Sequence, residues 1–181
     1  MKAEYKGKTK TGREIIIRYP IASDVDEMLR FINELSDERT FITYQGEKET
    51  LESETKYLDD KLKAIEDKKS VQLLVFCDNK LVGESEIHMM EKTQKHIGIF
   101  GITIGKGFRG EGVGKLLMNL ILKEANKNIP EIKIITLDVY STNDIARGLY
   151  KKMGFAEYGI LPGGITRNNK FEDAVLMYKN I

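Results

Sequence analysis

The sequence predicts an α/β fold of mixed type, in which strands and helices alternate around one sheet. Three observations lead to this prediction. The chain has 181 residues, 41% of them hydrophobic, which suits a single domain over residues 1–181 with a full-sized core. Apolar residues recur with the strand period in some segments and with the helix period in others. A glycine-rich turn joins a β-branched segment to an amphipathic one at residues 102–117.

The N-terminal half is predicted to contain a strand, two helices and a meander of three strands. A β-branched run ends at Pro20, and Ser23-x-x-Asp26 is typical of a capping box that opens an amphipathic helix. A second, charged helix has a thinner apolar stripe and is expected at the surface. The pair Asp78-Asn79 indicates a tight turn between two strands. The expected ranges are strand 14–19, a helix from Ser23, helix 49–69, and strands 71–76, 81–90 and 95–104.

The C-terminal half is predicted to alternate helices with strands. Pro130 ends the helix that follows the glycine turn, and Gly154 is expected to cap the next one. Pro162-Gly163-Gly164 is expected as a loop between the last two strands. The expected ranges are a helix from Gly112 to about 128, strand 132–139, helix 143–153, and strands 155–160 and 173–179. The complete order is β-α-α-β-β-β-α-β-α-β-β.

The glycine turn has the composition of an anion-binding site. Glycines let the main chain adopt positive φ, and the helix that follows directs its free N–H groups at a ligand such as a phosphate or pyrophosphate. Gly105-x-Gly107-x-x-Gly110 matches a dinucleotide fingerprint, so an oxidoreductase is one alternative, although its helix should open at the last glycine. A Walker loop is excluded because the spacing before Gly114-Lys115 is too short. What remains is Arg109-x-x-Gly112-x-Gly114.

Composition excludes several classes of partner. The formal net charge is +1, from 29 basic and 28 acidic residues, so we expect neither nucleic acid nor an anionic membrane as a partner. Cys77 is the only cysteine, which fits a reducing compartment. The N-terminal residues lack the apolar segment of a signal peptide, and no apolar run is long enough to span a membrane. A cytoplasmic location is therefore expected. No metal site is predicted, because His88 and His96 have no Cys or Asp at ligand spacing.

Two motifs together resemble the GCN5-related N-acetyltransferase (GNAT) superfamily. The first is the Arg109 to Gly114 turn, and the second is the segment 138–155, DVYSTNDIARGLYKKMGF. The second segment contains the family's Asn-x-x-Ala helix start at Asn143 and its closing Tyr-x-x-x-Gly-Phe at Tyr150. The motifs cover residues 95–160, and the order of elements extends the resemblance to most of the chain. It implies a mixed, mostly antiparallel sheet flanked by helices, and direct transfer of an acetyl group from acetyl-CoA to a primary amine in a ternary complex.

The resemblance also implies roles for individual residues. Tyr150 is the candidate general acid that protonates the departing thiolate. The strand before the glycine turn lacks the family's glutamate, so Glu86, which shares a strand face with Glu84 and His88, is the candidate base. The residues expected to bind acetyl-CoA are Ile102, Thr103, Ile104, Arg109, Gly110, Glu111, Gly112, Val113, Gly114, Lys115, Asn143, Tyr150 and Lys152.

The acceptor is expected to enter between the segments 31–57 and 161–171. Glu47, Glu49, Glu52, Glu54, Asp59 and Asp60 make the first segment acidic. This favours a cationic acceptor such as a polyamine, another small amine, a lysine or a protein N-terminus, whereas the alternative interpretation is a solvated helix face. The missing family glutamate leaves a non-catalytic CoA-binding module open as an alternative function, and a homodimer is also left open.

Overall fold

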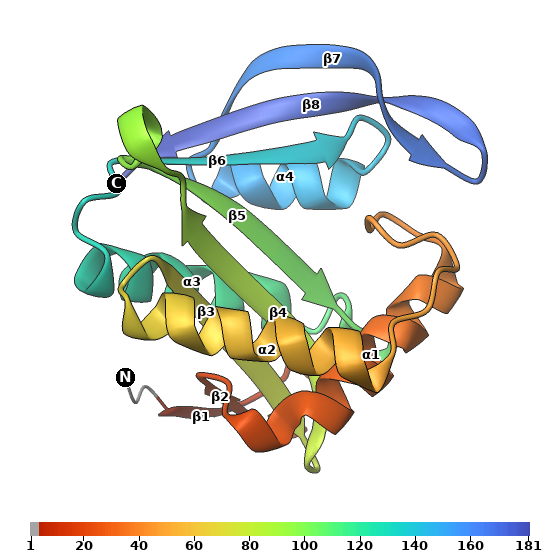
Figure 1. The fold of residues 1–181 in the computed structure, drawn as a ribbon. Coiled ribbons are helices and arrows are strands. Elements are labelled where there is room, and N and C mark those ends of the chain that lie inside the picture. The colour runs from red at the N-terminus through yellow and green to blue at the C-terminus, as the bar shows by residue number, and fades with distance from the viewer. Residues whose placement is uncertain (1–3) are drawn as a thin grey trace.

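The computed structural model describes residues 4–181 and contains an eight-stranded sheet with the order β1-β2-β3-β4-β5-β6-β8-β7 (Figure 1). Every neighbouring pair of strands is antiparallel except β5 and β6, which are parallel. The mixed, mostly antiparallel sheet is therefore confirmed. The strands are β1 (Glu4–Lys8), β2 (Glu14–Arg18), β3 (Ser70–Cys77), β4 (Lys80–Met89), β5 (Ile97–Ile104), β6 (Ile134–Tyr140), β7 (Ala156–Arg167) and β8 (Lys170–Asn180).

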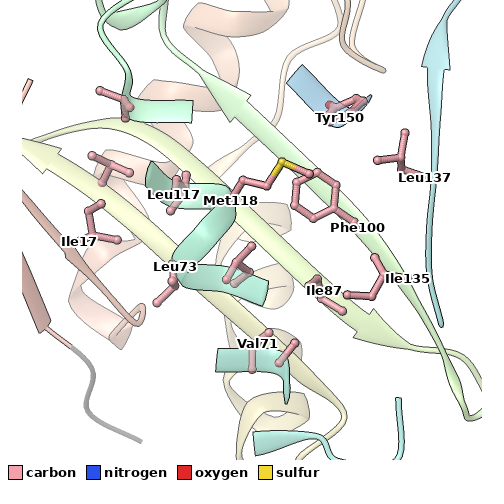
Figure 2. Packing of buried hydrophobic residues seen from close by; sticks show 14 of the residues in the cluster. Ile17, Val71, Leu73, Ile87, Phe100, Leu117, Met118, Ile135, Leu137 and Tyr150 are labelled. Carbon is pink, nitrogen blue, oxygen red and sulfur yellow. The ribbon is translucent and has the colours of Figure 1, made fainter. Parts of the chain in front are cut away.

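Helices cover both faces of the sheet. On one face, α1 (Val25–Glu38) and α2 (Leu51–Glu66) pack on Leu74 and Phe76 of β3. On the other face, α3 (Val113–Asn128) and α4 (Asp144–Lys152) pack on a larger cluster that includes the alternate residues of β3. Figure 2 shows Leu117 and Met118 of α3 lying over this second face of the sheet. The alternation of side chains along β3 thus separates two apolar layers, as expected for a strand buried on both faces.

Strands β5 and β6 separate soon after they begin. Their parallel pairing joins Ile97–Ile99 to Ile134–Thr136 only, so Phe100–Ile104 of β5 has no strand partner on that edge within residues 4–181. Beyond this point β6 keeps its pairing with β8, whereas β5 and β6 diverge (Figure 1). We call this region, Phe100–Ile104 of β5 and Leu137–Tyr140 of β6, the splay. It leaves main-chain groups of β5 free to bind a ligand.

The N-terminal strand β1 was not expected from the sequence. Its residues, Glu-Tyr-Lys-Gly-Lys, show no alternation of apolar and polar side chains. The strand forms because it pairs along its whole length with β2, from Glu4 opposite Arg18 to Lys8 opposite Glu14. Pairing with β2, whose Ile15 and Ile17 lie in the core, overrides the weak local preference of these residues.

The predicted capping box at Ser23 is wrong. Ser23 lies inside a 3₁₀ turn (Ala22–Asp24), and α1 begins at Val25. The Asp24 carboxylate accepts a hydrogen bond from the Ile21 N–H at 2.8 Å and forms a bidentate pair with Arg18 at 2.7 Å. A buried ion pair between β2 and the turn therefore sets the start of α1.

The predicted loop at Pro162-Gly163-Gly164 is also wrong. Strand β7 continues through these residues with a shift in register between Leu161 and Ile165. The turn to β8 lies instead at Asn168-Asn169, whose φ angles are 50° and 60°. Two consecutive residues with positive φ form a two-residue hairpin turn, and Asn tolerates this conformation. The result is a long β7–β8 arm, seen along the upper edge in Figure 1.

Candidate active site

The glycine turn connects the end of β5 to the start of α3. It runs through a short 3₁₀ turn (Lys106–Phe108), and Gly110 and Gly112 follow with φ angles of 77° and 85°. No acceptor within the described chain contacts the N–H groups of residues 109–112. The first N–H groups of α3 are free as well, as at every helix start. This arrangement fits a pyrophosphate, which needs several converging N–H donors.

Two charged side chains of the turn are engaged within the protein. The Arg109 Nε donates to the Ile104 carbonyl at 2.7 Å, and its guanidinium pairs with Glu38 at the end of α1 at 2.7 Å. The Glu111 carboxylate accepts from the N–H and hydroxyl of Thr11, at 3.1 and 2.8 Å. These side chains hold the turn in place and are engaged within the protein. The main-chain N–H groups of the turn are therefore the donors that remain free for a ligand. Lys115 is exposed, and Val113 is 1% exposed in the core.

The β1–β2 connection contacts the glycine turn. The Arg13 guanidinium donates to the Gly107 carbonyl at 2.7 Å and lies 3.8 Å from the centre of the Phe108 ring. The Lys10 N–H donates to the Glu111 carbonyl at 3.1 Å. A groove of about 220 Å³ lies between the two segments. Sequence reasoning missed this contact because residues 9–13 carry no apolar pattern and lie about a hundred residues from the turn.

The end of β5 presents its main chain toward the splay. Ile102 and Ile104 pack against the α3 side of the core, whereas the Thr103 hydroxyl lies 3.4 Å from Glu84 Oε1 on the α2 side. Because the side chains at these positions have partners on either face, the main chain is what remains for a cofactor arm. This agrees with the roles that the family resemblance implies for residues 102–104.

Tyr150 reaches the splay from the α4 side. Its ring packs edge to face against Phe100 of β5 at 6.0 Å and also contacts Phe155 at 6.1 Å. Figure 2 shows it between Phe100 on β5 and Leu137 on β6. The residue is 8% exposed, and burial, together with the charge of Asp138, raises the pKa of its phenol to about 12. The hydroxyl is therefore a proton donor at neutral pH.

The other two expected residues of α4 lie at its ends. The Asn143 side-chain oxygen accepts from the Ala146 N–H at 3.1 Å and caps the helix. Its amide nitrogen has no acceptor among the residues described, so this group is free to donate. Lys152 is exposed in the last turn.

The carboxylates of β4 reach the sheet from the opposite face, beneath α2. Glu84 pairs across the sheet with Thr103, and Glu86 with Gly101, so both lie beside the free part of β5. The Lys61 ammonium of α2 forms an ion pair with Glu86, and His88 Nδ1 lies 3.8 Å from the same carboxylate. Burial, with the charges of Glu86 and Glu54, raises the pKa of Glu84 to about 7. The sequence showed the shared face of Glu84 and Glu86 but not the cation that pairs with one of them.

The α1–α2 loop and the β7–β8 arm meet at the far end of the splay. The Tyr140 hydroxyl of β6 donates to the Ile42 carbonyl at 3.1 Å, and its ring packs against Phe41 at 5.5 Å. The Arg167 guanidinium of β7 lies 4.4 Å from the centre of the Phe41 ring. The structure thus brings together the two segments that the sequence analysis expected beside the acceptor.

The acidic run of residues 47–60 does not form one surface. Glu47 and Glu49 bond locally to Gln45, Tyr44 and Ser53. Glu52, Asp59 and Asp60 line a shallow recess on the outer side of α2. Glu54 is 6% exposed and faces the sheet. Within this run, Glu54 faces the sheet, whereas Glu52, Asp59 and Asp60 lie on a solvated outer face, as in the alternative interpretation.

Over residues 4–181, no group of three or more His, Cys, Asp or Glu side chains is arranged to hold a metal ion. In the same residues, no helix combines the length and the apolar character needed to cross a membrane.

Comparison with known proteins places this geometry in a family. The model of the acetyltransferase (GNAT) family matches residues 29–155, from within α1 to the end of the α4 motif. The chain belongs to the GNAT acetyltransferase family. It is an acyltransferase that uses acetyl-CoA as its co-substrate.

Individual relatives agree with this assignment. The L-amino acid N-acetyltransferase AaaT of Escherichia coli (strain K12) is 29% identical over 113 residues, which are 61% of this chain and 69% of AaaT. The crystal structure of a GNAT acetyltransferase from Streptococcus pneumoniae is 29% identical and covers 92% of this chain and 99% of its own, with a TM-score of 0.84. A putative acetyltransferase from Salmonella typhimurium, solved with acetyl-CoA, shares the fold at 13% identity with a TM-score of 0.78, covering 92% of this chain and 93% of its own.

The fold also removes the oxidoreductase alternative. A dinucleotide fingerprint works at the edge of a parallel sheet, where the helix opens at the last glycine. Here the only parallel pair among the described strands is β5 with β6, and α3 opens at Val113, beyond Gly110. The match of Gly105-x-Gly107-x-x-Gly110 is accidental.

Proposed function

We propose that this enzyme transfers the acetyl group of acetyl-CoA to a primary amine by direct attack in a ternary complex. One observation supports this most strongly. A protonated phenol, Tyr150, and two carboxyl groups, Glu84 and Glu86, approach the free edge of β5 from opposite faces of the sheet. An acyl transfer needs an acid and a base on opposite sides of the reacting carbonyl.

The glycine turn and the splay would hold acetyl-CoA. The N–H groups of residues 109–112 and of the first turn of α3 fit the pyrophosphate, with exposed Lys115 adding positive charge. Main-chain groups of residues 102–104 fit the pantetheine arm, and Asn143 and Lys152 border the same site from α4. A main-chain N–H near Ile104 would stabilise the charge that develops on the thioester oxygen.

The raised pKa of Tyr150 supports its role in the proton transfers. The acceptor enters as an ammonium ion and gives a proton to the β4 carboxylates, of which Glu86 is the candidate base. Its nitrogen then forms a bond to the thioester carbonyl carbon, and the carbon–sulfur bond breaks. Tyr150 gives its proton to the departing thiolate. The nitrogen, now part of the amide, releases its second proton to solvent, and solvent reprotonates Tyr150.

The acceptor is an amine of small size or an exposed amine of a larger molecule. AaaT acts on L-amino acids according to its name, which makes an α-amine one candidate. Polyamines, lysine side chains and protein N-termini are the others. We further propose that the enzyme works in the cytoplasm, because Cys77, its only cysteine, is buried as a free thiol.

The proposal is tested by measuring thiol release from acetyl-CoA with a panel of amines, amino acids and peptides. Acetylated product and free CoA in equal amounts are expected with at least one class of primary amine. Calorimetry should show binding of acetyl-CoA and none of NAD. If acetyl-CoA binds but no primary amine is acetylated, the chain is a CoA-binding module and the proposed reaction is wrong.

A further inference from the structure

Three carboxyl groups meet beneath α2, and only one of them has a cationic partner. Glu84 and Glu86 lie on β4, and Glu54 lies on α2 at 6% exposure. The Lys61 ammonium pairs with Glu86 and lies 5.2 Å from the centre of the Tyr57 ring. No ion pair formed by residues 4–181 includes Glu54 or Glu84. Two buried or half-buried carboxyl groups thus form no ion pair, and the Lys61 charge, which also acts on Glu84, is shared with Glu86. Burying carboxyl groups with so little compensation is costly in a protein interior.

Gln72 of β3 supplies an independent sign that a donor is missing. Its side chain is 1% exposed, and its Nε2 donates to the Tyr57 hydroxyl at 3.2 Å and to Glu84 Oε2 at 3.4 Å. These two bonds orient the amide toward the carboxyl cluster. Its Oε1 is buried and has no hydrogen-bond partner within the described chain.

The cluster therefore offers acceptors in excess of donors. A primary ammonium ion carries three N–H donors and one positive charge on a compact group. Such a group would pair with the carboxylates of Glu54 and Glu84. The intramolecular ammonium of Lys61 already occupies the neighbouring position on Glu86, beside an aromatic ring.

The cluster also borders the proposed reaction centre. Glu84 Oε1 lies 3.4 Å from the Thr103 hydroxyl, in the segment of β5 that faces the splay. Glu84 itself is partly exposed, whereas Glu54 and Gln72 are buried behind it. A cation that enters from the splay would reach Glu84 first.

We propose that Glu84, Glu54 and Gln72 form a binding site for the ammonium group of the acceptor, so that the enzyme prefers amines without a carboxylate beside the nitrogen. This inference rests on the proposed function. An α-carboxylate would enter a site that already holds uncompensated negative charge, and like charges repel strongly where water is excluded. The preferred acceptors are alkylamines, polyamines and lysine side chains, in contrast to free amino acids.

The experiment compares two substrates and four proteins at pH 8. Propylamine and 2-aminobutanoate share a carbon skeleton around the amine and differ by the α-carboxylate. The proteins are the wild type, Glu84→Gln, Glu54→Gln and, as a control, Glu66→Gln, which removes an exposed carboxylate from the same helix α2. Steady-state constants are measured for each amine, and calorimetry gives the affinity for acetyl-CoA. Circular dichroism checks that each variant is folded.

The wild type is expected to use propylamine at least tenfold better than 2-aminobutanoate, by kcat/KM. Glu84→Gln and Glu54→Gln should raise KM for propylamine about tenfold or more and reduce this preference, with the affinity for acetyl-CoA unchanged. Glu66→Gln should behave as the wild type. Equal kcat/KM values for both amines, or an unchanged KM in both cluster variants, would overturn the proposal.

A separate measurement tests the ammonium site even if no amine is acetylated. Propylammonium is then titrated into the CoA-bound wild type and the same variants by calorimetry. Binding that is lost in Glu84→Gln but kept in Glu66→Gln supports the site although the proposed reaction has failed. Absence of binding in the wild type, or equal binding in all variants, contradicts it. Tighter binding of Ca²⁺ or Mg²⁺ than of propylammonium would identify a metal site and also overturn the proposal.

Discussion

Tyr150 shows how burial sets the protonation state of a single residue. Its ring fills the space between β5 and the C-terminal end of α4, in contact with Phe100 and Phe155. The same burial raises the pKa of the phenol to about 12, which keeps the proton on the oxygen at neutral pH. Packing and protonation are therefore two results of one environment.

The substitution Tyr150→Phe tests the acid directly. The ring contacts are retained, so the affinity for acetyl-CoA and the melting temperature should change little. The rate kcat should fall about a hundredfold or more, as expected when a general acid is removed. Stopped assays of acetylated product and calorimetry measure both quantities. Full activity in this variant would mean that water protonates the thiolate.

Gly112 illustrates a requirement of the backbone. Its φ angle is 85°, and a side chain at this position would be strained in a conformation that costs an L-residue about 1–2 kcal/mol. Gly107 lies in the same turn, has no positive φ of this kind, and an added Cβ there would meet no atom within 4 Å. The two glycines are therefore a matched pair.

We expect Gly112→Glu to abolish acetyl-CoA binding and Gly112→Ala to weaken it. The first adds strain and a negative charge to the pyrophosphate site, and the second adds strain alone. Gly107→Ala should bind acetyl-CoA as the wild type does. Calorimetry on the three variants measures these affinities. An unchanged affinity in Gly112→Glu would show that the pyrophosphate does not bind at this turn.

Among the elements, the β1–β2 hairpin has a role that extends beyond the edge of the sheet. Its turn bonds to Glu111 and to the Gly107 carbonyl, and thereby restrains the anion-binding segment from outside. A loop that is already ordered loses less entropy when it binds a ligand. The hairpin should therefore contribute to affinity without touching the ligand.

The substitution Glu111→Ala removes the carboxylate that joins the two segments. The turn is then held less firmly before it binds, so we expect acetyl-CoA to bind a few-fold more weakly. Glu14→Ala is the control, because Glu14 lies on the same hairpin and forms only an exposed ion pair with Lys8 at 3.6 Å. If both variants bind acetyl-CoA equally well, the hairpin has no influence on the site.

At the scale of the whole molecule, the carboxyl groups beneath α2 link stability to pH. The pKa values of Glu54 and Glu84 are raised from 4.5 to about 7, mainly by burial. Between pH 4.5 and 7 the folded state therefore holds protons that the unfolded chain has released. The contribution of these two groups to the free energy of unfolding falls as pH rises through this window, and it changes little above it.

The variant Glu84→Gln has no carboxyl group to titrate at position 84. We take the free energy of unfolding of the variant minus that of the wild type. This difference should be larger at pH 8 than at pH 5. Urea denaturation at the two pH values measures this difference, in which the titration of His88 and the other shared groups largely cancels. A difference that is the same at both pH values would show that Glu84 titrates in the folded protein as it does in the unfolded chain.

The sequence by itself determined the order and type of nearly all elements, the glycine turn between β5 and α3, and the family. These features are local. Apolar periodicity, a glycine that must adopt positive φ, and a motif such as Asn143 to Phe155 are written in consecutive residues. The same reasoning failed for β1, for the start of α1 and for the loop at Pro162, where pairing with a neighbouring strand or an ion pair decides the local structure.

Only the tertiary structure decided which charges are free. It paired Arg109 with Glu38 and Glu86 with Lys61, and it left Glu54 and Glu84 without a cation. The partners in each pair are separated along the chain, so no pattern in the sequence connects them. The effect of a charge depends on what surrounds it, because burial and neighbouring charges set its protonation state and its availability to a ligand. That environment exists only once α2 has packed onto the sheet.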